Sequence, residues 1–238
     1  MSIHLLGGGR DTSRCGDLLR PFVREARARA GGRAPLIALL LVLESYDVPT
    51  LERFVDVLCA AGADAEEIRI EAVIEGEFFD DSVVEVDAMF VSGGLTPAYL
   101  NAFANIRDAV RSRVAEGMPY AGFSAGSAVA AGSALVGGYR VGGIEVVSED
   151  AGEELGEVAV RDGLGLVPFA VDVHAAQWGT LSRLVAAIDA GLVTEGVAID
   201  EHTALIVDAE GAETVHGTGQ VWKAEAAASG VLVRVRRA

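Results

Sequence analysis

The sequence predicts an α/β fold built on a mainly parallel sheet with helices on both faces. Short apolar runs alternate with amphipathic stretches along the whole chain, and several of these runs end in glycine-rich turns. This alternation is typical of successive β-α-β units. The chain has 238 residues, 51% of them hydrophobic, which is enough to bury a large core without a metal or a disulfide. We therefore expect residues 1–238 to form a single domain.

The N-terminal half contains four predicted strands and three predicted helices. The strands cover residues 3–7, 36–43, 66–74 and 86–94. A first helix is expected to begin near Pro21, and a second runs from Pro49 to Gly62 with apolar residues at the i, i+3, i+4 and i+7 spacing. Thr96 and Pro97 predict the N-cap and the first residue of a third helix, whose apolar positions continue to Val110.

The C-terminal half begins with a short predicted strand that ends at Phe123. Residues 132–166 are rich in glycine and acidic residues, which predicts loops and short edge strands. Strands are expected over 167–175 and 197–208, with a helix over 180–191 between them. The alternating tail VLVRVRR predicts a final edge strand.

The charge of the chain bears on its partners. The formal net charge is −16 and the pI about 4.6, so the average field repels nucleic acid and anionic membrane surfaces and favours a cationic or zwitterionic small substrate.

The two cysteines have no CxxC spacing and the N-terminus has no export signal, which together predict a cytoplasmic protein. The four histidines show no ligand spacing, so we expect neither a metal nor another cofactor. The sequence leaves open whether the chain acts as a monomer or a homodimer.

The segment GFSAG, residues 122–126, predicts a serine nucleophile at a sharp turn between a strand and a helix. Glycines two residues before and two residues after Ser124 leave room for the neighbouring strand and helix. The free N–H groups at the start of the helix would face a reacting carbonyl, so the Ala125 amide is a candidate oxyanion donor. Gly94, after the fourth strand, is a candidate for the second donor because the topology brings it to the same sheet edge.

A serine nucleophile needs a base, and His174 is the favoured candidate. It stands at the end of the strand over 167–175, where α/β enzymes place functional residues. The candidates for the acid that orients it are Asp172, Asp200 and Glu201, and spacing alone does not separate them.

Taken together, these residues resemble the dipeptidase E and cyanophycinase family of serine peptidases. The segments that carry the resemblance are GGG after the first strand, VSGGLTPAYL, GFSAGSAVA, DVHAAQWGTLSRL, AIDEHTALIV and VHGTGQVW, which together span most of the chain. The resemblance implies a flavodoxin-type three-layer sandwich of the class I glutamine amidotransferase-like kind. It also implies a serine hydrolase of small peptides or isopeptides.

Within that resemblance, each site residue has an implied role. Ser124 is the nucleophile, His174 the general base and Glu201 the acid, since the cyanophycinase branch has the motif IDExTAL. The amides of Gly94 and Ala125 form the oxyanion hole.

The chain also departs from both branches of the family. Tyr139 stands where the dipeptidase branch has its acid, which argues against an aspartyl dipeptidase of the usual design. Thr96 replaces a glutamine of the cyanophycinase branch, and of that branch's arginine-rich helix start only Arg183 is retained, which argues against the arginyl-polyaspartate polymer as substrate. We expect Thr96, Asp172 and Arg183 to contact substrate, with Arg183 facing a substrate carboxylate.

Two other functions remain open from the sequence. An α/β-hydrolase esterase would share GxSxG but would need His216 as its base, with Asp172 or Asp200 as the acid. A binding module could retain the fold without turnover.

Overall fold

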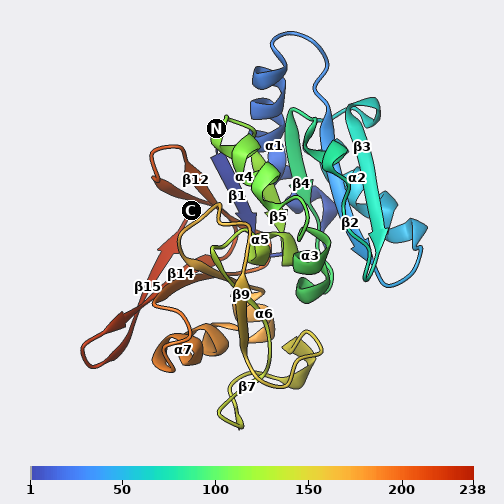
Figure 1. Ribbon diagram of the computed structural model, residues 1–238. Helices are drawn as coiled ribbons and strands as arrows, with labels where there is room; N and C mark the ends of the chain where they lie inside the picture. The colour runs from blue at the N-terminus through green and yellow to red at the C-terminus, as the bar shows by residue number, and fades with distance from the viewer. Residues whose placement is uncertain (1) are drawn as a thin grey trace.

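The computed structural model describes residues 2–238, and its largest sheet has seven strands in the order β13-β12-β1-β5-β4-β2-β3 (Figure 1). These strands are β1 (Ser2–Leu6), β2 (Ile37–Leu43), β3 (Ile68–Ile74), β4 (Ala88–Val91), β5 (Tyr120–Phe123), β12 (Thr203–Asp208) and β13 (Glu213–Gly217). The five strands from β1 to β3 in this order are parallel, whereas β12 and β13 are antiparallel to their neighbours. The parallel part therefore places the carboxyl ends of β1, β5, β4 and β2 at one edge.

Helices cover both faces of this sheet. On one face lie α1 (Thr12–Ala30) and α2 (Val48–Ala60), and on the other α3 (Thr96–Ala102), α4 (Arg107–Ala115) and α5 (Ala125–Val129). In the fully buried strand β2, Leu39 and Leu41 pack toward α1 and α2, and Leu40 packs toward the opposite layer. The sandwich is thus three-layered, as expected. Every helix within residues 2–238 is too short or too polar to cross a bilayer.

A second sheet of four strands lies beside the first (Figure 1). Its strands, in spatial order, are β10 (Ala170–Val173), β11 (Glu195–Ile199), β14 (Gln220–Ala227) and β15 (Gly230–Arg237). The helices α6 (Ala175–Trp178) and α7 (Leu181–Asp189) connect β10 to β11. Val171, Val197 and Val221 belong to the same buried cluster as Leu5 and Leu205 of the larger sheet, so the two sheets share one core.

The region from 132 to 166 consists of loops and short strands, as predicted. It contains β6 (Ser133–Gly137), β7 (Arg140–Val141), β8 (Ile144–Glu145) and β9 (Ala159–Asp162). Short 3₁₀ turns occur at Ala65–Glu67, Asp81–Val84 and Glu149–Ala151.

The first helix begins nine residues earlier than predicted. Asp11 caps α1 by accepting a hydrogen bond from the Arg14 amide at 3.0 Å, and Pro21 lies inside the helix. Proline lacks the N–H that an internal helical position would use. The helix nevertheless continues through it because Leu19 and Phe22, on either side, are fully buried against the sheet.

The predicted third helix is two helices, α3 and α4, although its apolar positions are buried as expected. Its N-cap is Leu95 rather than Thr96, because the Leu95 carbonyl accepts the amides of Ala98 and Tyr99.

The prediction of a single strand over 197–208 is wrong. Residues 200–202 form a turn that separates β11, in the four-stranded sheet, from β12, in the seven-stranded sheet. The Asp200 carboxylate stabilises this turn by accepting hydrogen bonds from the amides of Ala176 and Gln220 and from the indole of Trp222. His202 has a positive φ of 53°, so the chain reverses there and Glu201 lies at the turn.

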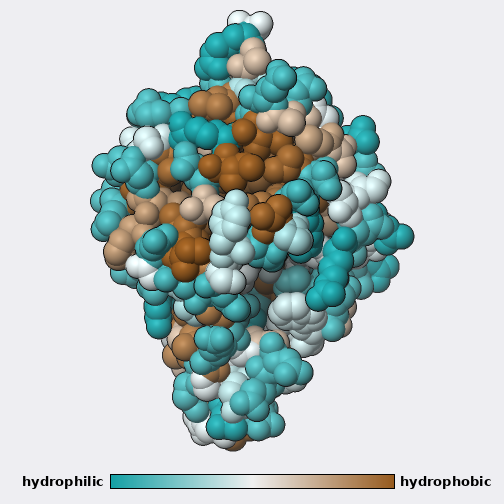
Figure 2. Space-filling model, turned by 90° about the vertical axis from the view of Figure 1, so that its right-hand side faces the viewer, coloured by the Kyte–Doolittle hydropathy of each residue, from teal (hydrophilic) through white to brown (hydrophobic). Residues whose placement is uncertain are grey.

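The strand β3 forms one edge of the seven-stranded sheet, and this side of the molecule faces the viewer in Figure 2. Hydrophobic side chains gather in the upper half of that view. On β3 itself Ile70 is 45% exposed, while Arg69 and Glu71 form an ion pair at 2.9 Å. Charged side chains on an edge strand disfavour pairing with another strand.

Candidate active site

Ser124 lies at a strained turn between β5 and α5. Its backbone angles are φ 52° and ψ −110°, a combination that few non-glycine residues adopt and that is found where surrounding structure enforces it. The Ser124 amide donates to the Leu6 carbonyl at 3.0 Å, and its carbonyl accepts from the amides of Ser127 and Ala128. The turn is therefore held on both sides by backbone hydrogen bonds.

The glycines around Ser124 are required by close packing of backbone. A Cβ at Gly122 would overlap the backbone of Gly126, and a Cβ at Gly126 would overlap the Val91 carbonyl of β4. The spacing GxSxG thus allows the strand, the turn and the helix to approach one another, as the sequence predicted.

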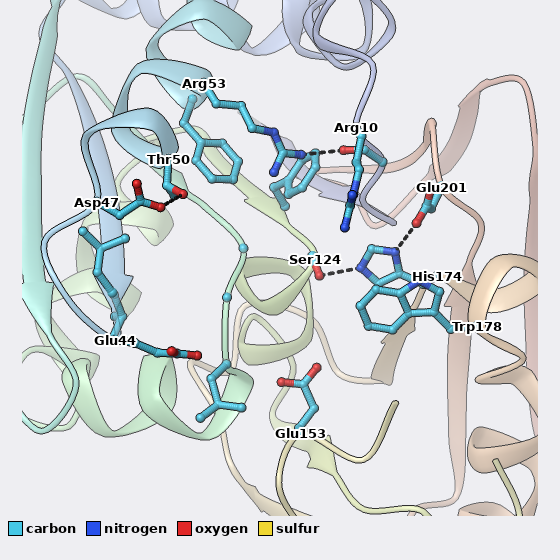
Figure 3. A pocket seen from close by; sticks show the side chains of 18 of the residues that line it. Arg10, Glu44, Asp47, Thr50, Arg53, Ser124, Glu153, His174, Trp178 and Glu201 are labelled. Carbon is cyan, nitrogen blue, oxygen red and sulfur yellow. Dashed lines mark hydrogen bonds and ion pairs between the residues drawn. The ribbon is translucent and has the colours of Figure 1, made fainter. Parts of the chain in front are cut away.

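The side chain of His174 reaches Ser124 from the other sheet. His174 follows β10 in a left-handed conformation with φ 56°, and its Nε2 lies 2.7 Å from the Ser124 Oγ (Figure 3). Its Nδ1 lies 2.8 Å from Oε1 of Glu201, the residue at the turn between β11 and β12. A hydroxyl, an imidazole and a carboxylate are therefore joined in one hydrogen-bonded chain.

The other two candidate acids do not contact His174. The Asp200 carboxylate is occupied within its turn, as described above. Asp172 is 2% exposed and forms a bidentate ion pair with Arg183, with N–O distances of 2.6 and 2.9 Å. Of the three acids that the sequence left open, Glu201 is the one that lies beside the imidazole.

Asp172 and Arg183, expected to contact substrate, do not line the cavity beside Ser124 and pair with each other instead. Arg183 is 4% exposed, and besides pairing with Asp172 it donates to the carbonyls of Gly138 and Ala151. A guanidinium on the first turn of a helix is unfavourable unless it is paired. Here its partner is an internal carboxylate instead of a ligand.

Thr96 does not line the cavity beside Ser124 either. It is 3% exposed, and its amide donates to the Glu153 carboxylate at 2.8 Å. It acts on the site through Glu153.

Burial controls the protonation of His174. The side chain is 8% exposed, and this burial lowers its pKa, because a charged imidazolium loses hydration. Hydrogen bonding to Glu201 and the charge of that carboxylate act in the opposite direction. The result is a pKa below the ordinary histidine value, which favours the neutral form that can accept a proton.

Two backbone amides near Ser124, those of Gly94 and Ala125, have no hydrogen-bond partner within residues 2–238. Gly94 lines the same cavity as Ser124, and Ala125 is the first residue of α5. Free amides at a helix start and a glycine turn are suitable donors for an oxyanion.

Ser124, His174 and Glu201 line a cavity of about 1030 Å³ between the sheet edge and the 149–154 loop. Besides Glu201, seven carboxylates line this cavity, two of them Asp47 and Glu75. We call the other five the acidic wall: Glu44, Glu149, Asp150, Glu153 and Glu154. Arg10 and Arg53 also line the cavity, on the side of α1 and α2 (Figure 3). Arg53 donates to the Gly9 carbonyl at 2.7 Å and lies over the rings of Phe54 and Phe123.

Figure 3 shows the Glu153 side chain pointing toward Ser124. Burial raises the pKa of its carboxyl, and hydrogen bonding from Thr96, whose amide donates to it, acts in the opposite direction. Glu153 and Glu154 both have positive φ, at 54° and 60°. Sequence analysis missed this residue, although the acidic composition of 132–166 was a signal for it.

The fold and the serine turn define the class of this protein. A serine at a strained strand-to-helix turn, hydrogen-bonded to a histidine that is in turn paired with a carboxylate, is typical of serine hydrolases.

Comparison with known proteins identifies the family. The model of peptidase family S51 matches residues 43–215, so the chain belongs to this family and is a serine peptidase. It is 26% identical over 229 residues to a cyanophycinase from Nostoc sp. and to one from Trichormus variabilis, covering 92% of this chain and 72% of each relative. The resemblance expected from the sequence motifs is confirmed.

Solved structures share the fold. A peptidase from an acI-B1 actinobacterium superposes with a TM-score of 0.60 at 16% identity, covering 97% of this chain and 96% of that one. A peptidase E protein from Listeria monocytogenes gives 0.58 at 14% identity, covering 92% and 98%. The predicted flavodoxin-type fold is therefore confirmed.

Proposed function

We propose that this chain hydrolyses short peptides or isopeptides through a triad of Ser124, His174 and Glu201. The Ser124 hydroxyl attacks the scissile carbonyl while His174 accepts its proton. The Gly94 and Ala125 amides stabilise the resulting oxyanion. The imidazolium then donates its proton to the leaving nitrogen, the C–N bond breaks, and an acyl ester remains on Ser124.

The second half of the reaction restores the enzyme. Water gives a proton to neutral His174 and attacks the ester, and the imidazolium returns that proton to Ser124 as the carboxylic acid leaves. Glu201 holds the tautomer in which Nδ1 carries the hydrogen and balances the charge of the imidazolium. The observation that supports this proposal is the chain of contacts at 2.7 and 2.8 Å leading from a strained serine through His174 to Glu201.

An esterase that uses His216 is disfavoured by the same geometry. His216 lies on β13, is exposed, and pairs across the strands with Ala204. It does not line the cavity around Ser124.

The charges in the cavity favour a substrate that carries a positive charge. Glu153 forms no ion pair within residues 2–238, although the charge of the buried Arg183 acts on it, and a half-buried carboxylate is costly unless it is paired. A substrate ammonium or guanidinium bound there would supply the missing partner. The two cyanophycinase relatives match over most of this chain, but their substrate is not assigned to it by similarity.

Replacing Ser124 tests the proposed nucleophile. We expect Ser124→Ala to lower kcat by roughly 10⁴- to 10⁶-fold on any dipeptide that the wild type cleaves, because nucleophile and base act as a unit. Ser112→Ala, on the exposed side of α4, is the matched control and should retain full activity. Turnover and labelling by a fluorophosphonate probe measure the effect. Equal labelling of wild type and Ser124→Ala would refute the assignment.

Replacing Glu153 tests the proposed cation site. The substrates are two matched dipeptides, one with arginine and one with citrulline, its uncharged isostere. We expect the wild type to favour the arginine peptide in kcat/KM by about tenfold or more, and Glu153→Gln to lose most of that preference through KM. Glu210→Gln, an exposed residue after β12, is the control. An unchanged preference in Glu153→Gln contradicts the proposed site.

A further inference from the structure

Trp178, the last residue of α6, stacks on the imidazole of His174. The two ring centroids are 4.0 Å apart and the rings are inclined by 8°, and Figure 3 shows the indole beneath the imidazole. Trp178 is 45% exposed, and the two residues before it are also exposed. Trp178 is therefore not part of the buried core, and its indole stacks on the candidate base.

We propose that Trp178 is a positioning residue that restrains the ring of His174 and stabilises its protonated form during the reaction. This inference rests on the proposed function, since it requires His174 to be the base.

The first part of the argument concerns the freedom of the ring. Hydrogen bonds to Ser124 and Glu201 hold the two nitrogens of His174. Rotation of the ring about the line through its nitrogens would leave both contacts largely in place. A parallel indole on one face resists that rotation, because tilting the imidazole would drive one of its edges into the indole. On the Cε1 edge the ring lies so close to Gly8 that a Cβ there would overlap it.

The second part concerns charge. The imidazole becomes an imidazolium when it accepts the serine proton, and the face of an indole attracts a cation. The other charged groups near His174 are Glu201 and Asp172, which favour the imidazolium, and Arg183, which disfavours it. Arg10, on the loop between β1 and α1, adds a further positive charge to the cavity (Figure 3). Burial also disfavours the imidazolium, so the indole offsets part of that cost without adding a competing proton acceptor.

Two substitutions separate the two contributions of Trp178. Trp178→Leu retains an apolar cover over His174 but removes the aromatic face, whereas Trp178→Phe retains both. In Trp178→Leu we expect kcat to fall by about three- to tenfold with little change in KM, and the pKa of His174 to fall by about half a unit. Trp178→Phe should have nearly the wild-type kcat and the wild-type pKa of His174.

Two measurements report these effects. The acid limb of kcat/KM against pH gives the midpoint in the active enzyme. A proton NMR titration of the His174 Cε1–H in the Ser124→Ala background gives it without turnover, with the resonance assigned by its loss in His174→Gln.

The inference is overturned if Trp178→Leu leaves the midpoint unchanged or raises it, or if Trp178→Phe is as slow as Trp178→Leu. Activity that survives in Ser124→Ala would instead count against the proposed function. The two failures are therefore distinguishable.

Discussion

The seven-stranded sheet supplies the candidate nucleophile, and the four-stranded sheet supplies its candidate base. Ser124 follows β5 in the centre of the larger sheet and is held mainly by backbone, through strained angles and glycine packing, while the Ser127 hydroxyl also donates to the carbonyls of Leu6 and Gly122. His174 follows β10 of the smaller sheet and is held mainly by side chains, through Glu201 and Trp178. One half of the site is thus built into the main chain, and the other half depends on contacts that single substitutions can remove.

The two halves meet along the turn that follows β1. The Gly7 carbonyl accepts the His174 amide at 3.0 Å, the Gly8 carbonyl accepts the His202 amide at 2.9 Å, and the Gly7 amide donates to Thr203. A Cβ at Gly7 would overlap the backbone of Asp200. The distance between Ser124 and His174 therefore depends on two glycines that let the sheets approach.

Within the half of the site held by side chains, the largest expected effect comes from replacing Glu201. We expect Glu201→Gln to lower kcat by up to about 10⁴-fold with little loss of stability, because the amide no longer favours the tautomer with a proton on Nδ1. Steady-state kinetics and the urea midpoint measure the two quantities. A loss of less than about tenfold would mean that another group orients His174.

The next expected effect is a loss of stability when the buried ion pair of Asp172 and Arg183 is broken. We expect Arg183→Met to lower the free energy of unfolding by about 3–5 kcal/mol, because it leaves Asp172 charged and unpaired in the interior. The double variant Asp172→Leu/Arg183→Met should recover most of this loss. Urea unfolding measures both variants. A double variant as unstable as the single one would show that the carbonyl contacts of Arg183, not its charge, matter most.

The smallest expected effect is the dependence of kcat/KM on pH, which reports the protonation of His174. Since burial lowers the pKa of His174, kcat/KM should rise with pH and reach half of its plateau below pH 6.5, the ordinary histidine value. The sign for stability follows from the same shift: the unfolded chain binds the proton more readily, so stability is lost as pH falls from 6.5 toward the lower folded pKa. The rise of kcat/KM with pH should persist in His202→Gln, which removes the other histidine that lines the cavity. A midpoint above 6.5, or its disappearance in that variant, contradicts the prediction.

The two halves also differ in how far the sequence predicts them. The apolar run at β2 and the motif around Ser124 are local signals, and the fold and the serine turn follow from them. No local signal predicts that residues 197–208 form two strands, because β11 and β12 are both apolar. The turn between them depends on hydrogen-bond donors from distant residues: Ala176, Gln220 and Trp222.

The acidic wall and the pairing of Arg183 were missed for a related reason. Asp172 and Arg183 are 11 residues apart, and the sequence cannot tell whether their partner is a ligand or each other. Glu153 is brought to the cavity by a loop whose path depends on contacts with distant segments, including the Thr96 amide.

Arg183 holds the loop that bears Glu149, Asp150, Glu153 and Glu154 by the carbonyl oxygen of Ala151. It also donates to the carbonyl of Gly138, whose amide in turn donates to the Gly152 carbonyl of that loop. Because these contacts are made to backbone oxygens, they do not depend on which side chains the loop carries. Under the proposed function, substitutions at Glu149, Asp150 and Glu154 would change the charge of the cavity while this backbone anchor and the triad stay in place, so these three positions suit directed evolution toward new peptides.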